Sequence, residues 1–310
     1  MKILVTGAGA IGGYFGGMLA RVGEDVTFLA RGHHLDAINR RGLKIESVSD
    51  GKFTVAAPAV DQPDGSWTAD LVLLCVKSYH NETAFAAMGP AVGEGTAILT
   101  LQNGVGSGDQ LAAAFGRDKV LLGVAYIEAA RRTPGVVAEL GGERRIVFGE
   151  EDGAQSPRAV AIRDVLQRAG LDVELTSDVL QALWNKLVMI CALSGMTCIT
   201  RASFAEAIDN PGTLDLTWRV VREAAAVGRA RGVNLAADVV ESTMDYFQRF
   251  KNELVSSMHS DLEAGRPLEL GVINEAISRF GKEVGVATPA NDFITACLTL
   301  ADRRAMSTAF

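Results

Sequence analysis

Short apolar runs, separated by segments long enough to form helices, organise the first half of the chain. Residues 2–6 form a β-branched and apolar run that ends in a glycine cluster, and small and apolar residues recur at helical spacing over residues 10–22. Similar runs predict strands at residues 26–29, 71–76 and 97–101. Strands that alternate with crossover helices predict a doubly wound parallel sheet.

The pattern changes after residue 177. Before this point the sequence predicts three more strands, a helix and a closing strand, over residues 120–124, 136–140, 145–148, 157–169 and 171–175. After it, apolar residues recur only at helical spacing, and the predicted helices cover residues 178–195, 213–231, 236–265, 268–284 and 289–302. Ser177 or Asp178 is the predicted N-cap of the first of these helices. We therefore expect an α/β fold with a sheet domain over residues 1–177 and an all-helical domain over residues 178–310.

Composition narrows the class of partner. A formal net charge of −7 on 310 residues argues against nucleic acid or an anionic membrane surface, and leaves small molecules. The apolar stretch over residues 187–200 contains polar interruptions and is short for a membrane span, so we expect a buried helix and no membrane partner. Residues 1–12 pass directly from a strand to a glycine turn, unlike a signal peptide. Four scattered cysteines without zinc-ligand spacing predict no metal site and reduced core thiols in a cytoplasmic protein: Cys75, Cys191, Cys198 and Cys297.

The glycine cluster carries the strongest chemical signal. Gly7-Ala8-Gly9-Ala10-Ile11-Gly12 has the spacing G-x-G-x-x-G between a predicted strand and a predicted helix. Gly7 permits a tight turn, Gly9 lets backbone N–H groups approach a pyrophosphate, and Gly12 lets the helix pack closely on the strand. A purely structural glycine turn is the alternative. The context favours a Rossmann domain that binds a nicotinamide dinucleotide.

The residues after the second strand bear on the choice of cofactor. NAD-preferring Rossmann domains usually carry an acidic residue there, whereas this chain reads Leu29-Ala30-Arg31-Gly32-His33-His34. Arg31 therefore favours the 2′-phosphate of NADPH, unless it is only a solvated surface arginine. Lys77, just beyond the strand at residues 71–76, could add a second positive charge. We expect His33 and His34 on the surface.

A further polar segment follows the strand at residues 97–101, at the same carboxyl edge of the sheet. It reads Gln102-Asn103-Gly104-Val105-Gly106. The Asn103 amide could face the nicotinamide or the substrate. Equally, Asn-Gly could serve only as a turn.

Several separated motifs together resemble the ketopantoate (2-dehydropantoate) reductase family over nearly the whole chain. They are the glycine turn with Arg31, Lys77, Gln102-Asn103-Gly104, Ala129-Ala130-Arg131-Arg132, Trp184-Asn185-Lys186-Leu187, Ser256-Ser257-Met258-His259-Ser260-Asp261 and Glu269. The resemblance implies NADPH as cofactor, a Rossmann domain followed by a helical domain, and an active site in the cleft between them. It also places Ala130 with the cofactor-binding residues.

The resemblance further implies roles for individual side chains: Lys186 as general acid, Ser257 on the substrate carboxylate or hydroxyl, and Glu269 beside the cofactor ribose or the lysine. Hydride delivery to a ketone builds alkoxide charge, which a lysine ammonium can stabilise and protonate. On helix spacing alone, Lys186 would be a surface lysine. Asp261 follows Ser257 by one helical turn, and either supports Ser257 or caps local structure.

The chain departs from the family pattern along the helix of Lys186. Where the family typically has asparagines that bind the substrate, this chain has Ile190, Ser194 and, if no gap intervenes, Phe204. A lost amide partner weakens the binding of a polar substrate. We expect Ile190 and Ser194 to line the substrate site and to favour a more apolar or differently shaped 2-oxo acid.

Three hypotheses follow. The first is an NADPH-dependent reductase of a 2-oxo acid or ketone, acting on ketopantoate or on another substrate. The second is a non-catalytic sensor or regulatory paralogue that binds NADPH. The third is a β-hydroxy-acid dehydrogenase, which is disfavoured because the usual glycine three residues before the lysine is Leu183. Apolar helix faces could be buried internally or in a homodimer, so both oligomeric states stay open.

Overall fold

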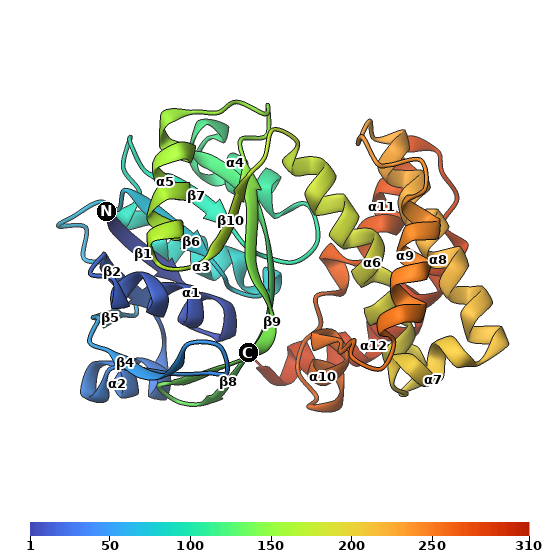
Figure 1. The fold of residues 1–310 in the computed structure, drawn as a ribbon, viewed down its shortest axis with the longest axis horizontal. Coiled ribbons are helices and arrows are strands. Elements are labelled where there is room, and N and C mark those ends of the chain that lie inside the picture. The colour runs from blue at the N-terminus through green and yellow to red at the C-terminus, as the bar shows by residue number, and fades with distance from the viewer. Residues whose placement is uncertain (310) are drawn as a thin grey trace. The chain divides into compact units, whose positions relative to one another are not determined.

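The computed structural model describes residues 1–309, which fall into two compact units (Figure 1). Unit 1 comprises Met1–Gln102 and Ser107–Val179, and unit 2 comprises Asn103–Gly106 and the chain from Leu180 onward. The short segment Asn103–Gly106 therefore groups with the helices, although the sequence pattern places it within the sheet domain.

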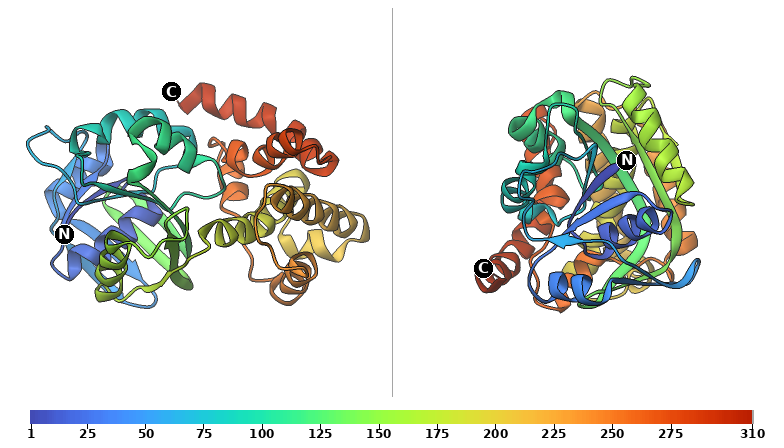
Figure 2. Two further views of the ribbon diagram at one scale, coloured as in Figure 1. Left: turned by 90° about the horizontal axis from the view of Figure 1, so that it is seen from above. Right: turned by 90° about the vertical axis from the view of Figure 1, so that its left-hand side faces the viewer.

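Unit 1 is built on one sheet, which has ten strands among the described residues, in the order β4-β3-β9-β8-β7-β6-β1-β2-β5, with β10 paired to β9. The strands are β1 (Lys2–Thr6), β2 (Asp25–Leu29), β3 (Leu43–Ser47), β4 (Gly51–Val55), β5 (Ala59–Val60), β6 (Leu71–Leu74), β7 (Ala97–Thr100), β8 (Val120–Thr133), β9 (Val136–Gly149) and β10 (Asp172–Leu175). The helices are α1 (Ala10–Arg21), α2 (Gly32–Arg41), η1 (Ser78–His80), α3 (Asn81–Met88), η2 (Gly89–Ala91), α4 (Ser107–Phe115), η3 (Arg117–Lys119) and α5 (Pro157–Arg168). Helices cover both faces of the sheet, with α1 on one side and α3 and α4 on the other (Figure 2).

The predicted α/β fold is confirmed. Strands β5, β2, β1, β6, β7 and β8 pair in parallel, and their apolar side chains form one buried core. Two antiparallel pairings, β3 with β4 and β8 with β9, make the sheet mixed at one end. The two strands expected at residues 136–140 and 145–148 are one strand, because shifts in its register with β8 carry the pairing past Gly141 and Gly142.

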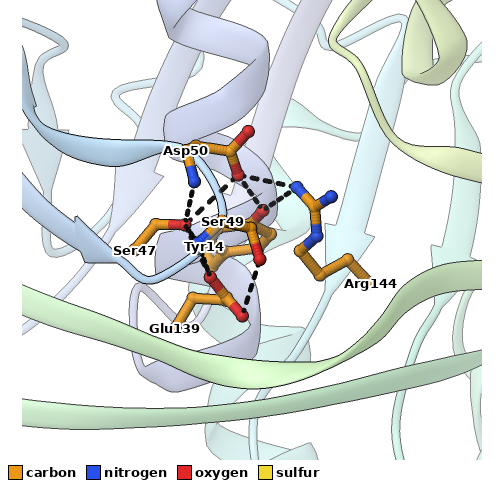
Figure 3. A network of polar contacts seen from close by, with 6 residues as sticks. All are labelled: Tyr14, Ser47, Ser49, Asp50, Glu139 and Arg144. Atoms are coloured by element: carbon orange, nitrogen blue, oxygen red, sulfur yellow. Dashed lines mark hydrogen bonds and ion pairs between the residues drawn. The ribbon is translucent and has the colours of Figure 1, made fainter.

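A polar network ties α1 to the mixed end of the sheet (Figure 3). Asp50, in the turn between β3 and β4, accepts hydrogen bonds from Tyr14 of α1 at 2.7 Å and from Arg144 of β9 at 2.8 Å. Glu139 is fully buried and accepts from the Ser47 hydroxyl at 2.5 Å. Burial, together with the neighbouring Asp50 carboxylate, raises the pKa of Tyr14 to about 12, so the phenol remains a donor. The network holds the hairpin of β3 and β4, which the sequence pattern did not reveal, against α1.

Unit 2 is helical, as expected. Its elements are α6 (Val179–Thr200), α7 (Phe204–Asp209), α8 (Pro211–Ala230), α9 (Val239–Phe250), α10 (Ser257–Glu263), η4 (Leu270–Val272), α11 (Asn274–Val284) and α12 (Pro289–Ala309). The helix expected over residues 236–265 is wrong, because Ser256 accepts a hydrogen bond from the His259 backbone and starts a new helix there. The short helix α7 was not expected, and it begins with a capping box between Ser203 and Glu206.

Helix α6 lies in the core of unit 2. It is long and apolar enough to cross a membrane, with a mean hydropathy of 1.5 over its most apolar stretch, but 61% of that stretch is buried within the protein. A core helix meets the same criteria of length and composition. Cys191 and Cys198 of α6 are buried as expected, whereas Cys75 is only partly buried and Cys297 on α12 is exposed, because its helix turns that position to solvent.

Candidate functional site

The carboxyl ends of four parallel strands in unit 1 meet at one edge of the sheet. The register pairs Thr6 with Leu29 and with Leu74, and pairs Leu74 with Thr100. The glycine turn, Arg31, Lys77 and Gln102 follow these strand ends directly, so the sheet brings their backbones to the same edge. This is the edge at which open α/β sheets bind ligands.

The geometry of the glycine turn fits a dinucleotide phosphate. Gly7 has φ +99°, and a side chain there would lie 2.8 Å from Val76. A Cβ atom at Gly12 would lie 2.3 Å from the carbonyl oxygen of Gly7, so only glycine permits this approach of helix to turn. Gly9 is the N-cap of α1 and has no atom within 4 Å of an added Cβ, which leaves open space beside the positive end of the helix.

An open pocket of about 490 Å³ lies beside Arg31. Leu35, Ala86 and Ala87 supply apolar lining, and Gly32, Asp61, Gln62 and Thr83 complete it. The Arg31 side chain is exposed, and its guanidinium donates to the Thr83 carbonyl at 3.5 Å. Such a pocket can hold a flat ring against its apolar wall and a phosphate against the arginine. Lys77, three residues beyond β6, is half-buried.

His34 is not a surface residue, contrary to expectation. Only 6% of it is exposed, because Nε2 lies 2.6 Å from the Ala8 carbonyl in the glycine turn and Nδ1 accepts from the Gly135 N–H at 2.9 Å. His33 is exposed as expected.

In unit 2, hydrogen bonds link three polar side chains: the Lys186 ammonium, the Asn103 amide and the buried Glu269 carboxylate. The Lys186 ammonium on α6 donates to Asn103 Oδ1 at 2.9 Å, and Asn103 Nδ2 donates to Glu269 Oε2 at 3.3 Å. Glu269 is only 3% exposed, and Lys186 is half-buried. Because an ammonium can only donate and a carboxylate can only accept, the two partners fix the orientation of the amide. The arrangement orients an ammonium while a carboxylate balances its charge.

The backbone around Asn103 explains how this residue meets Glu269. Gly104 has φ +77°, and a Cβ atom there would lie 2.0 Å from the carbonyl oxygen of Val272. The Val105 N–H donates to the same oxygen at 3.2 Å. The segment therefore packs against η4, which Glu269 precedes as N-cap. Gly104 therefore provides the turn that the Asn-Gly pair predicts, and the Asn103 side chain contacts Lys186 and Glu269.

Beyond Lys186, the residues at the next two helical turns of α6 are largely buried. Ile190 is 9% exposed and belongs to the apolar core. Ser194 is 5% exposed, and its hydroxyl accepts from Ser256 at 3.1 Å. Phe204, at the start of α7, is 1% exposed and packs edge-on against Phe247. This part of α6 is therefore poor in polar groups not already engaged within the protein.

The remaining candidate residues, Ser257, Asp261 and Ala130, differ in burial and in their contacts. Ser257, the first residue of α10, is exposed, whereas Asp261 is 8% exposed and its carboxylate accepts from Arg266 at 2.8 Å. Asp261 therefore forms an ion pair with Arg266. Ala130 is half-buried on β8 of unit 1, opposite Ala138 of β9.

Two side chains whose hydrogen bonds were not predicted from the sequence are Ser256 and Gln102. Ser256 both caps α10 and bonds to Ser194, and a serine pair inside the helix expected over residues 236–265 was the available signal for a helix start. Gln102 donates to the Val76 carbonyl at 2.8 Å and to Asn81 at 2.7 Å, so it braces the strand ends rather than facing a ligand.

Comparison with known proteins gives full-length matches. Residues 3–153 match the family model "Ketopantoate reductase PanE/ApbA", and residues 178–302 match "Ketopantoate reductase PanE/ApbA C terminal". The 2-dehydropantoate 2-reductase of Pyrococcus horikoshii is 31% identical over 291 residues, which cover 94% of each chain. A PanE/ApbA family ketopantoate reductase from Ralstonia eutropha has a TM-score of 0.90 at 33% identity, over 99% of this chain and 100% of that one. A D-mandelate dehydrogenase solved in complex with NADH has a TM-score of 0.87 at 25% identity, over 98% and 99% of the two chains.

Proposed function

Because this chain belongs to the ketopantoate reductase family of NAD(P)H-dependent oxidoreductases, we propose that it reduces a 2-oxo acid to the 2-hydroxy acid with NADPH. The observation that carries the proposal is the hydrogen-bonded chain of Lys186, Asn103 and Glu269. It provides an oriented proton donor, which reduction of a carbonyl requires.

The residues of unit 1 fit the cofactor. The turn from Gly7 to Gly12 would hold the pyrophosphate, and Arg31 with Lys77 would hold the 2′-phosphate of NADPH. When bound, the nicotinamide supplies the hydride. The absence of a carboxylate directly after β2 favours NADPH over NADH.

The residues of unit 2 would handle the proton. As the carbonyl oxygen gains negative charge, the Lys186 ammonium stabilises it and then transfers a proton to it. Asn103 keeps the ammonium in one orientation, and the buried Glu269 carboxylate offsets the cost of its charge. Ser257 and Asp261 are assigned to the substrate side by resemblance only, and the Asp261 carboxylate accepts a hydrogen bond from Arg266.

The proposal extends to the identity of the 2-oxo acid substrate. Ketopantoate is the first candidate, because relatives of full length are named 2-dehydropantoate 2-reductase. The second candidate is a 2-oxo acid with an apolar substituent. It is favoured by the apolar Ile190 and by Ser194, whose hydroxyl already accepts a hydrogen bond from Ser256. The two candidates differ in the hydroxyl group that ketopantoate carries and that an apolar wall would leave without a partner.

NADPH oxidation followed by absorbance with ketopantoate, pyruvate, 2-oxoisovalerate and phenylglyoxylate tests the proposal. We expect turnover with at least one of them, and a higher kcat/KM with NADPH than with NADH. Binding of NADPH without oxidation by any 2-oxo acid would instead support a sensor.

The protein is further proposed to act in the cytoplasm on small molecules. Light scattering of the purified chain distinguishes a monomer from a homodimer, which the sequence leaves open.

A further inference from the structure

His34 makes two hydrogen bonds that together define its protonation state. The Gly135 N–H can only donate, so Nδ1, 2.9 Å away, carries no proton. The proton of the neutral ring therefore lies on Nε2, which donates to the Ala8 carbonyl at 2.6 Å. Burial, assisted by the nearby Arg131 charge, lowers the pKa of His34 despite the bond to Ala8, so the ring is neutral near pH 7.

The bond to Ala8 controls the direction of a neighbouring N–H group. In a trans peptide the C=O and N–H point in opposite directions, so fixing the Ala8 carbonyl toward His34 points the Gly9 N–H away from it. Nothing lies within 4 Å of an added Cβ at Gly9. The N–H groups of Gly7 and Ala8 are already directed to the Leu29 carbonyl, at 3.3 and 3.4 Å. The peptide that His34 holds is thus the first of the turn whose N–H is not directed to the Leu29 carbonyl, and it lies at the N-cap of α1, the positive end of the helix.

The same histidine connects the turn to other parts of unit 1. Gly135 is buried in the connection between β8 and β9, and Arg31, three residues before His34, caps α2 and lines the open pocket. One short helix therefore carries both the arginine beside the pocket and the clamp on the glycine turn. Helix α2 therefore fixes the distance between Arg31 and the glycine turn.

We propose that His34 is a positioning residue for the dinucleotide: its Nε2–H holds the Ala8 carbonyl so that the Gly9 N–H is aimed at the pyrophosphate. This role rests on the proposed function, because it requires that the turn binds a dinucleotide. It predicts that His34 affects ligands that contain a pyrophosphate and leaves other ligands unaffected.

Two amide substitutions separate the two bonds of His34. His34→Gln places an amide N–H near the position of Nε2 and can still donate to Ala8. His34→Asn places a carbonyl near the position of Nδ1 and can accept from Gly135, but does not reach Ala8. His34→Ala removes both bonds. The Gln and Asn variants serve as controls for each other, because each loses one of the two bonds.

The test is the dissociation constant of the full-length protein for NADPH and for adenosine 2′-monophosphate, which lacks the pyrophosphate. We expect His34→Ala and His34→Asn to weaken NADPH binding about tenfold, the value of one well-placed hydrogen bond, and His34→Gln to stay within about threefold of the wild type. The affinity for adenosine 2′-monophosphate should stay within about twofold in all three.

Two results would overturn the inference. One is an equal loss of affinity for both ligands, which indicates general damage to unit 1; the other is unchanged NADPH binding in His34→Asn. If His34→Ala does not fold, the comparison of the Gln and Asn variants decides alone. A wild-type protein that binds neither NADPH nor NADH would instead refute the proposed function, whatever the variants do.

Discussion

Replacing Asn103 with alanine removes a side chain that hydrogen-bonds to both Lys186 and Glu269. Two hydrogen bonds to charged groups are lost, at 2.9 and 3.3 Å. Each such bond contributes about 1.5–3 kcal/mol. Lys186 is half-buried and can recover part of this from water, whereas Glu269 is only 3% exposed and is largely shielded from water. We expect Asn103→Ala to lower the free energy of unfolding by about 2–4 kcal/mol.

Asn103→Ala also removes a hydrogen bond that orients the Lys186 ammonium. A displacement of about 1 Å at a catalytic group can cost on the order of a hundredfold in rate. We therefore expect kcat to fall about a hundredfold, with the Kd for NADPH unchanged within about threefold. Urea unfolding gives the stability, and NADPH oxidation at saturating 2-oxo acid gives kcat.

Asn291→Ala provides the matched control. Asn291 is fully buried in unit 2, where its amide donates to the Glu223 carboxylate at 2.8 Å and accepts from Asn274 at 3.0 Å. It should lose a comparable amount of stability while kcat stays within about threefold of the wild type. Wild-type kcat in Asn103→Ala would refute an orienting role for Asn103, and so would a loss of kcat in proportion to stability in both variants.

Three further changes test other parts of the structure. Arg31→Ala should raise the KM for NADPH by about ten- to a hundredfold and leave that for NADH within about threefold, in steady-state assays with each cofactor; equal effects on both would remove Arg31 from the 2′-phosphate site. Arg144 has φ +50° and pairs with Asp50, so Arg144→Gly and Arg144→Ala both lose the ion pair but only glycine relieves the backbone. The glycine variant should be more stable by about 1 kcal/mol in urea unfolding, and an alanine variant of equal stability would argue against strain. Because the pKa of His34 is lowered in the fold, the unfolded chain binds more protons, and stability should fall as pH drops below about 6.5. This decline should be shallower in His34→Gln, measured by thermal unfolding across that range.

The central strands and the glycine turn were predictable because their signals are local. An apolar run with glycine after it determines both the strand and the turn at β1, and continuous apolar runs likewise predict β6 and β7. The break between α9 and α10 was harder to predict, since residues 251–256 continue an apolar helical pattern. A single side-chain cap at Ser256 decides that the helix restarts.

The contacts of the site depend on residues far apart in the chain. Asn103 and Glu269 are separated by 166 positions, and the packing of Gly104 against Val272 brings them together. His34 bonds to partners 26 and 101 positions away, and nothing in its local sequence distinguishes it from the exposed His33. Motif spacing could name Lys186 and Glu269 as candidates, but the bridging role of Asn103 required the fold.

The role of Lys186 as proton donor is tested most directly by the rate of NADPH oxidation by Lys186→Met, compared with the wild type on the best 2-oxo acid of the panel. Methionine keeps an unbranched apolar chain and removes the ammonium. We predict a loss of about a hundredfold or more in kcat, with the Kd for NADPH within about threefold of the wild type. A Lys186→Met variant that turns over at the wild-type rate would contradict this role.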